Sequence, residues 1–363
     1  MSRIVSIGVR YGREVRTNDY YRREQPEALA RATERGLARA FNTEGGDSRS
    51  AGFDHAMSRY LTDPFRGATV RHKLAPDETS ISLEADAARD ALGAAQAEPG
   101  DIDLVLCSSW LPENYVAPGN GVYLAKELGL SAPAINLETA CSSGLAALEM
   151  ADSLLSTGRH RKVLVVLSNT VSRQAGDANT LSWISSDIAA AAVLEASPEH
   201  TLVRSVAMEN TAETCGCFVH ELHPLDDGRT QVRMTVGPAG TRALRATSGP
   251  EMVQRLCSQA LERAGRTIDD IVLFACSTPL AWFSELCREA MAADLSQMQD
   301  LFPQMGNAGL PFPLVHLHHA AAAGRLKPGD QVLIYTVGSV SSAGAMVLEV
   351  GDWALGPHPG ARQ

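Results

Sequence analysis

The chain has 363 residues, 45% hydrophobic and 20% charged, a composition typical of a globular protein with a sizeable core. Its formal net charge of −10 at pH 7 argues against a nucleic-acid-binding protein, and no basic run offsets that charge. No apolar stretch approaches the roughly 18 residues that a membrane span needs, and seven cysteines, an odd number, fit a reduced cytoplasm better than a disulfide framework.

The first sixty residues join a short apolar start to a long polar segment. Residues 1–15, MSRIVSIGVRYGREV, lack the pattern of a secretory signal peptide, and we expect a cytoplasmic protein. Residues 18–60 are polar and include the run GGDSRSAG at 45–52. We interpret the segment at about 18–60 as an insertion or flap.

Two stretches that lie far apart in the chain follow the same order of elements. Residues 87–110 predict a helix, a Pro-Gly turn and a buried strand, and residues 256–279 repeat helix, turn and strand 169 positions later. The strands KVLVVLSN at 162–169 and QVLIYTVG at 331–338 have the same offset, and a further apolar strand follows each. This agreement indicates an internal duplication.

The duplicated units predict a layered α/β fold. Each unit alternates helices with nearly continuous apolar strands, as in sheets that helices cover on both faces. We expect two similar halves, residues 1–200 with the insertion and residues 201–363, packed into a five-layered α/β/α/β/α arrangement. The active site would lie where the halves meet, at strand ends and helix N-termini.

One cysteine stands among very small residues in LETACSSGLAALEM, residues 137–150. Cys141 follows the apolar run 132–138 and precedes a predicted helix, whose dipole would lower the pKa of the thiol and favour the thiolate. The small neighbours let an acyl chain and backbone donors approach the sulfur. We predict that Cys141 is a nucleophile; a buried structural cysteine is the alternative.

This region resembles the nucleophile region of the thiolase superfamily and, within it, the ketoacyl-ACP synthase III branch. The resemblance rests on ETACSSGLAALEMADSLLSTG followed by KVLVVLSN, and on VRTND at 15–19, RHKLAPDET at 71–79, SSDIAAAAVLEA at 185–196, MGNAG at 305–309 and AAGRLKPGDQVLIY at 322–335. It covers nearly the whole chain, and the duplication agrees with it. It implies a thiolase-like fold, an acyl group carried on Cys141, and a homodimer formed through the half that bears the nucleophile.

The second half departs from the catalytic pattern of that family. Its members carry a His in a His-Gln-Ala-Asn motif and an Asn in a Gly-Asn motif about 30 residues later. The Asn is present as Asn307, but Ser277 stands where the His is expected, and Trp282 replaces an arginine that relatives use to dock the phosphopantetheine of the carrier. Because His and Asn together stabilise the enolate of decarboxylative condensation, the loss favours simple acyl transfer from Cys141.

A replacement base is available in the segment 213–229, ETCGCFVHELHPLDDGR. His220 is our first candidate for a general base near Cys141. Two alternatives remain: a metal site, because Cys215, Cys217, His220 and His223 read Cys-x-Cys-x2-His-x2-His, and histidines with no chemical role. We expect no metal, since structural zinc sites more often show Cys-x2-Cys spacing.

A second histidine cluster follows Asn307. His316, His318 and His319 fall on a predicted helix, whose spacing spreads them around the axis, and we interpret them as mostly structural.

A small-residue loop, VGSVSSAG at 337–344, aligns with the glycine-rich loop that closes the site in relatives. By this resemblance the backbone N–H of Ser339 is a candidate oxyanion donor opposite Cys141. No GxGxxG loop is present, and no cofactor is implied beyond the acyl-CoA or acyl-carrier-protein substrate.

We therefore expect an acyltransferase of secondary, polyketide-type metabolism. Cys141 would take an acyl group from a CoA or carrier-protein thioester and pass it to a small-molecule acceptor, with Asn307 polarising the second reactant and His220 as base. Two alternatives remain open: a decarboxylative condensing enzyme with a rewired base, and a non-catalytic partner of an active homologue. Retention of both Cys141 and Asn307 speaks against the latter.

Overall fold

The computed structural model describes residues 1–41, 56–58, 60, 62–113, 117–173, 175–211, 214–224, 230–236, 249–339 and 341–359. The run GGDSRSAG at 45–52 lies outside them. In the described part of the chain, no helix has the length and apolar character needed to cross a membrane.

Two sheets form the centre of the molecule. The first has the strand order β14-β1-β7-β6-β4-β5, with β1 (Ser2–Tyr11), β4 (Leu104–Trp110), β5 (Ala134–Asn136), β6 (Lys162–Asn169), β7 (Ile188–Ala196) and β14 (Ala354–Leu355). The second has the order β11-β12-β13-β8, with β8 (Val203–Asn210), β11 (Ile271–Cys276), β12 (Gln331–Gly338) and β13 (Ser342–Glu349). The strands predicted at 162–169 and 331–338 are β6 and β12, with the same bounds.

The duplication is visible in how the strands pair. β4 pairs with β6 in parallel and β6 with β7 antiparallel, and β11, β12 and β13 repeat this arrangement. Even the turns correspond, because the short 3-10 helices η2 (Pro99–Asp101) and η5 (Ile268–Asp270) precede β4 and β11. Strands β6, β7, β12 and β13 are buried almost throughout, as expected for sheets covered on both faces.

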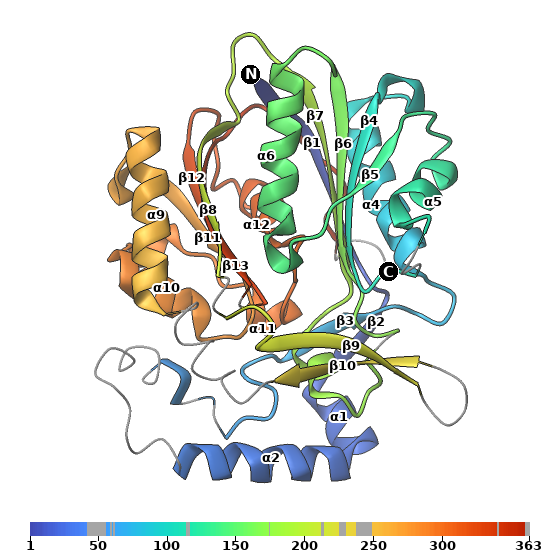
Figure 1. Ribbon diagram of the computed structural model, residues 1–363, viewed down its shortest axis with the longest axis vertical. Helices are drawn as coiled ribbons and strands as arrows, with labels where there is room; N and C mark the ends of the chain where they lie inside the picture. Colours follow the sequence, from blue (N-terminus) through green and yellow to red (C-terminus); the bar gives the residue numbers. More distant parts are fainter. Residues whose placement is uncertain are drawn as a thin grey trace.

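Helices occupy three layers around the two sheets, as Figure 1 shows. The helices are α4 (Ser80–Ala95), α5 (Asn120–Glu127), α6 (Ser143–Ser156), α9 (Pro250–Ala264), α10 (Phe283–Met291) and α12 (Phe312–Ala322). α4 and α5 cover the outer face of the first sheet, α9 covers the second sheet with α10 packed against it, and α6 and α12 lie between the sheets. The five-layered α/β/α/β/α arrangement is confirmed, and α12 is apolar on nearly all sides because protein surrounds it.

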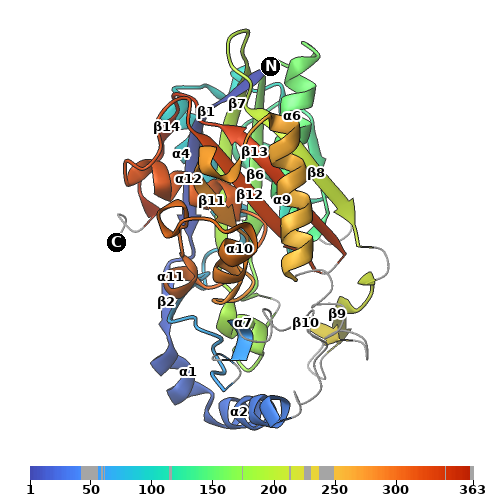
Figure 2. The ribbon, with the colours of Figure 1, turned by 90° about the vertical axis from the view of Figure 1, so that its left-hand side faces the viewer.

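Most of the remaining elements gather at one end of the molecule. They are β2 (Glu14–Thr17), α1 (Asn18–Glu24), α2 (Pro26–Phe41), β3 (Val70–Lys73), α7 (Thr180–Ile184), β9 (Phe218–Pro224), β10 (Thr230–Val236) and α11 (Phe302–Met305). The short 3-10 helix η6 (Leu295–Gln297) lies elsewhere, beside the start of β11. Figures 1 and 2 place α1 and α2 at the end opposite the N-terminus, with the β9–β10 hairpin above them. Part of the segment at 18–60 thus forms helices; its role as a flap stays a prediction.

Candidate active site

Cys141 lies in a sharp connection between a strand and a helix. β5 ends at Asn136, the 3-10 turn η3 (Ala140–Ser142) follows, and α6 begins at Ser143. Ala140 has a φ of 51°, a left-handed conformation that a non-glycine residue adopts at a cost of order 1–3 kcal/mol. This turn presents Cys141, which is partly exposed, at the start of the helix.

The very small residues around Cys141 allow the two halves to pack closely. Thr336 Oγ1 in β12 donates to the carbonyl of Cys141 at 3.3 Å, and Ser342 Oγ in β13 lies 2.8 Å from Ser142 Oγ. A Cβ added to Gly144 would lie 2.5 Å from the carbonyl oxygen of Leu310. The run of small residues is therefore a requirement of packing as well as of access to the thiol.

Burial is the largest influence on the pKa of the nucleophile. Desolvation raises the pKa of Cys141 to about 11, and the nearby carboxylate of Glu138 raises it further. The backbone N–H of Ala140 donates to Glu138 Oε1 at 2.7 Å, which fixes that carboxylate beside the turn. The expected lowering is therefore wrong: near neutral pH Cys141 is a thiol, and its proton must leave as it attacks.

Cys141 opens into a cavity of about 230 Å³ that lies between the two halves. Most of its wall is apolar, including Trp110, Val171, Leu181, Leu280, Phe283 and Val337. His220 and Asn307 also line it, so the structure brings together three of the four residues predicted to be catalytic, and Ser339 lies in the same wall. No Asp, Glu, Lys or Arg is among the described residues of the wall, and this apolar lining explains the desolvation of the thiol.

Asn307 is held firmly by backbone contacts. Its N–H donates to the carbonyl of Ile184 at 2.6 Å, and its own carbonyl accepts from the N–H of Ser186 at 3.2 Å. The side-chain Oδ1 accepts from the N–H of Gly309 at 2.8 Å, which leaves the Nδ2 group as the donor for a ligand. Gly306 precedes it with a φ of 64°, the left-handed region that favours glycine.

His220 reaches the cavity from the β9–β10 hairpin. Its ring lies edge-on to Trp110, with 4.7 Å between the ring centroids. Burial lowers the pKa of His220 below its usual value, so the ring is neutral at pH 7 and accepts a proton. Within the described part of the chain, no hydrogen bond joins the Cys141 thiol to His220 or Asn307.

The alternative metal site does not assemble. Residues three apart on a strand point to opposite faces, so His223 faces away from His220, with its Nε2 3.7 Å from a Glu221 carboxylate oxygen. Among the described residues, no three His, Cys, Asp or Glu side chains form a group that could hold a metal ion. All seven cysteines are free.

Ser277, which stands where the family has its histidine, is not in the cavity wall. It follows β11, its N–H donates to the carbonyl of Tyr335 at 2.8 Å, and its buried Oγ has no hydrogen-bond partner among the described residues. The next residue, Thr278, accepts from the N–H of Ala308 at 3.0 Å and so supports the turn beside Asn307.

Ser339 is one of the residues that bound the cavity. It has a φ of 48°, a conformation that favours glycine. Val340 lies outside the described residues.

Trp110 is a wall residue that we did not predict. It ends the buried parallel strand β4, and its position at the carboxyl end of a strand could have indicated a place in the site. Trp110, His220 and Ser339 also line a second, more polar cavity of about 500 Å³.

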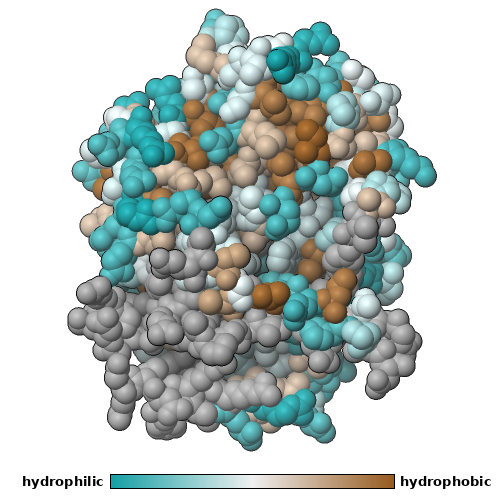
Figure 3. Space-filling view, in the orientation of Figure 1, coloured by the Kyte–Doolittle hydropathy of each residue, from teal (hydrophilic) through white to brown (hydrophobic). Residues whose placement is uncertain are grey.

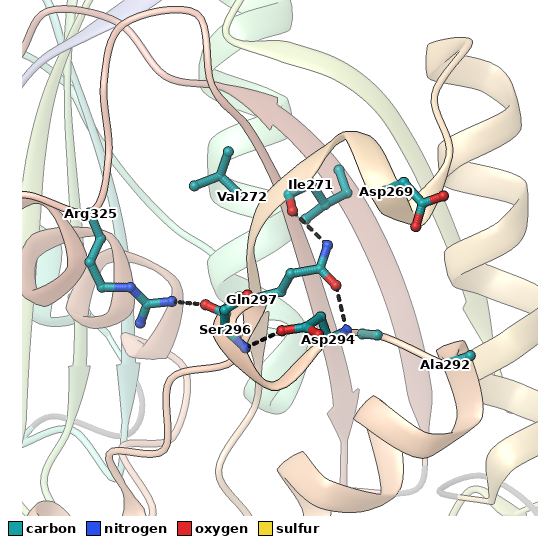
Figure 4. A pocket seen from close by; sticks show the side chains of 9 residues that line it. Asp269, Ile271, Val272, Ala292, Asp294, Ser296, Gln297 and Arg325 are labelled. Atoms are coloured by element: carbon teal, nitrogen blue, oxygen red, sulfur yellow. Dashed lines mark hydrogen bonds between the residues drawn. The ribbon is translucent and has the colours of Figure 1, made fainter.

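The histidines of α12 lie outside this cavity wall. His319 Nε2 is 2.5 Å from Tyr11 Oη, His318 Nε2 is 3.3 Å from the carbonyl of Gly356, and burial lowers the pKa of His316 to about 3. A larger hollow of about 780 Å³ at the β11 edge contains none of the predicted site residues. Its side chains bond to neighbouring groups, as between Arg325 and the carbonyl of Ser296 (Figure 4).

Comparison with known proteins agrees with the geometry. Two family models match, 3-oxoacyl-[acyl-carrier-protein] synthase III over residues 135–212 and its C-terminal counterpart over 261–350. The beta-ketoacyl-[acyl-carrier-protein] synthase III of Brucella suis is 29% identical over 295 residues, which cover 78% of this chain and 88% of the relative. The enzyme of the same name from Brucella anthropi is 29% identical over 289 residues, with the same coverage.

Solved structures share the fold over almost the entire chain. The 3-oxoacyl-[acyl-carrier-protein] synthase III of Aquifex aeolicus has a TM-score of 0.75 at 20% identity, covering 96% of this chain and 100% of its own. The priming beta-ketosynthase of the R1128 polyketide pathway has a TM-score of 0.76 at 22% identity, with 97% of each chain covered. Xanthomonas campestris OleA with bound lauric acid and lauroyl-CoA has a TM-score of 0.74 at 18% identity, covering 96% and 99%.

Proposed function

Since the chain is a ketoacyl-ACP synthase III-like member of the thiolase superfamily, we propose that it loads an acyl group onto Cys141 and transfers it to a second substrate. One observation carries the proposal: Cys141, Asn307 and the neutral His220 line a single apolar cavity, whereas Ser277 does not. In the proposal Cys141 carries the acyl group, Asn307 is the polarising amide and His220 is the base, and the histidine of a condensing enzyme has no counterpart at Ser277.

The first step is attack of the Cys141 sulfur on the carbonyl carbon of a thioester. The sulfur–carbon bond forms, the thiol proton moves to the departing thiolate of the donor, and the free donor thiol leaves. The backbone N–H groups of Cys141 and Ser339 are the proposed donors to the oxyanion. Because burial raises the pKa of Cys141 to about 11, we expect proton transfer and carbon–sulfur bond formation to be concerted.

The second step transfers the acyl group to an alcohol or amine. His220 takes the proton of the acceptor as its oxygen or nitrogen attacks, and Asn307 Nδ2 donates a hydrogen bond to the reacting carbonyl or to the acceptor. The Cys141 thiolate leaves and recovers a proton from His220. A neutral histidine suits this role, since a protonated ring cannot accept a proton.

The proposed donors are acyl-CoA and acyl carrier protein, and the acceptor is a small molecule. The names of the curated relatives include the carrier protein, and one structure of the same fold holds lauroyl-CoA. A role in secondary metabolism is part of the proposal, with the R1128 polyketide enzyme as the related example. Trp282, in place of the docking arginine, lines the cavity. Loading assays with acyl-CoA and with acyl carrier protein decide between the two donors.

Decarboxylative condensation is the second candidate, because Asn307 lies in the cavity and the curated relatives are beta-ketoacyl synthases. Against it, the described wall offers no cationic side chain to a malonyl carboxylate and no histidine at Ser277. The deciding experiment isolates acyl-loaded enzyme and adds either a malonyl thioester or a panel of alcohols and amines. We expect an ester or amide and no CO2; CO2 release with a β-ketoacyl product would overturn the transferase assignment.

The proposal includes a homodimer formed along the first sheet. β5 is the edge strand of that sheet, and its Ile135 is 43% exposed. Val122 and Tyr123 of α5 and Met150 of α6 are also exposed, and Figure 3 shows hydrophobic side chains gathered over α6 and β5. An exposed strand edge flanked by apolar side chains supports pairing with a second copy.

A further inference from the structure

Strand β3 buries two cations side by side. Residues two apart on a strand share a face, and the inward face of β3 carries Arg71 and Lys73, both with 0% exposure. Burial of a charged group is strongly unfavourable unless the group finds partners. Two such residues on one short strand therefore call for a functional explanation.

The two cations donate hydrogen bonds to alternate backbone carbonyls at the C-terminal end of α7. Arg71 Nε donates to the carbonyl of Trp183, and Lys73 Nζ donates to the carbonyl of Ser185 at 2.9 Å. The carbonyl between them, that of Ile184, accepts instead from the N–H of Asn307 at 2.6 Å. The segment is thus fixed by β3 at two carbonyls and by Asn307 at the third.

A single peptide group connects Lys73 to Asn307. The carbonyl of Ser185 accepts from Lys73, and the N–H of the same peptide, carried by Ser186, donates to the carbonyl of Asn307 at 3.2 Å. A cation on the carbonyl oxygen polarises the peptide and strengthens its N–H as a donor, because hydrogen bonds in a chain reinforce one another. Ser186 Oγ also donates to the carbonyl of Met305, on the other side of Gly306.

We propose that Lys73 is a positioning residue: its buried ammonium holds and polarises the Ser185–Ser186 peptide, and this peptide fixes Asn307 at the cavity that contains Cys141. The inference rests on the proposed function, because it assigns Lys73 to the placement of the amide that polarises the reacting group. Lys73 itself does not line the cavity, so it acts through the backbone.

The charge on Lys73 depends on pH not far above neutrality. Desolvation lowers its pKa to about 8; the carboxylates of Asp187 and Asp177 oppose this shift, and the cations of Arg16 and Arg71 add to it. Asp187 is committed to other donors, the N–H groups of Leu74 at 2.8 Å and Ser172 at 3.0 Å. We therefore expect the polarising effect to be largely present at pH 7 and to be lost as the pH rises through about 8.

The test compares Lys73→Met, which keeps the length of the side chain, with Lys73→Arg and with the exposed control Lys327→Met. Loading by acyl-CoA is followed by intact-protein mass spectrometry, and single-turnover transfer is followed from pre-loaded enzyme. We expect Lys73→Met to load at close to the wild-type rate and to transfer about 10- to 100-fold more slowly, as for a small displacement of a reacting group. The transfer rate of the wild type should decrease above pH 8, and that of Lys73→Met should not show this decrease. Lys73→Arg should transfer faster than Lys73→Met, and its transfer rate should decrease only at higher pH.

Hydrogen exchange of the resting protein gives a readout that needs no substrate. The peptide spanning 302–310 should exchange faster in Lys73→Met than in the wild type or Lys327→Met. Unchanged exchange, or wild-type transfer with an unchanged pH profile, would overturn the proposal, as would a general loss of loading, transfer and thermal stability together. Faster exchange in a protein that never loads an acyl group would support the positioning role and refute the proposed function.

Discussion

Two residues in the cavity have pKa values that burial shifts in opposite directions. Desolvation disfavours the charged form of each group, so it raises the pKa of Cys141 to about 11 and lowers that of His220. Both groups are therefore neutral at pH 7, one able to give a proton and the other able to take one. This pair suits acyl transfer, in which a proton must move in each step.

Replacement of His220 by Ala tests its role as the base of the second step. We expect transfer from acyl-loaded enzyme to slow by about 100-fold or more, with a much smaller effect on loading. Because burial lowers the pKa of His220, the decline of wild-type transfer with falling pH should have its midpoint below that of an ordinary histidine. The matched control is His223→Ala, on the opposite face of the same strand, and equal losses in the two variants would exclude a specific role for His220.

The buried ammonium of Lys73 predicts a pH dependence of the free energy of unfolding that is independent of the reaction. The pKa of Lys73 is about 8 in the fold and 10.5 in its ordinary state, so between these pH values the unfolded chain holds a proton that the folded chain has released. The free energy of unfolding of the wild type should then rise relative to that of Lys73→Met, by about 1–3 kcal/mol. Urea unfolding of both proteins between pH 7 and pH 10.5 measures this change, and a constant difference would contradict a buried ammonium.

At the scale of elements, features that depend on one segment of the chain were predicted from the sequence. Features that depend on contacts between distant segments were not. β6 and β12 were predicted with their observed bounds because each is a nearly continuous apolar run. The helix that follows Cys141, α6, was also predicted. The pKa of Cys141 was not, because it depends on a cavity wall assembled from both halves, and the bond from Lys73 to Ser185 joins residues 112 positions apart.

Helix α6 depends on a glycine for its close approach to the second half. A Cβ on Gly144 would lie 2.5 Å from the carbonyl oxygen of Leu310, so Gly144→Ala should destabilise the protein by about 1–3 kcal/mol. Gly93 in α4 is the matched control, since nothing lies within 4 Å of the added Cβ and the change favours the helix. Thermal unfolding of the two variants gives the answer; similar stabilities would contradict the tight packing at Gly144.

At the scale of the whole molecule, the duplicated architecture explains where the site lies. Cys141 comes from the first half, while Asn307 and Ser339 come from the second, and their shared cavity forms only where the halves meet. The repeat was evident from the sequence because a common offset of 169 positions relates its strands and turns. Which wall residues meet at the cavity, such as Trp110 and His220, depends on the packing of the β9–β10 hairpin, and no local pattern encodes it.

The proposed dimer is testable through one exposed side chain. Ile135 on the edge strand β5 would be buried between two copies, so Ile135→Asp should convert a dimer to a monomer. Leu295 is the control, because it is 75% exposed on η6 and lies outside the proposed interface. Light scattering after size-exclusion chromatography measures the mass; a dimeric Ile135→Asp protein, or a monomeric wild type, would contradict the proposed interface.

The central claim is that Cys141 carries the acyl group, and intact-protein mass spectrometry tests it most directly. Wild-type protein mixed with a panel of acyl-CoA and acyl-carrier thioesters should gain the mass of one acyl group, and Cys141→Ala should gain none. Peptide mapping should place the added mass on the segment that contains Cys141. An equal adduct on Cys141→Ala, or no adduct on the wild type with any donor, would contradict the account, and the second result would favour a non-catalytic partner.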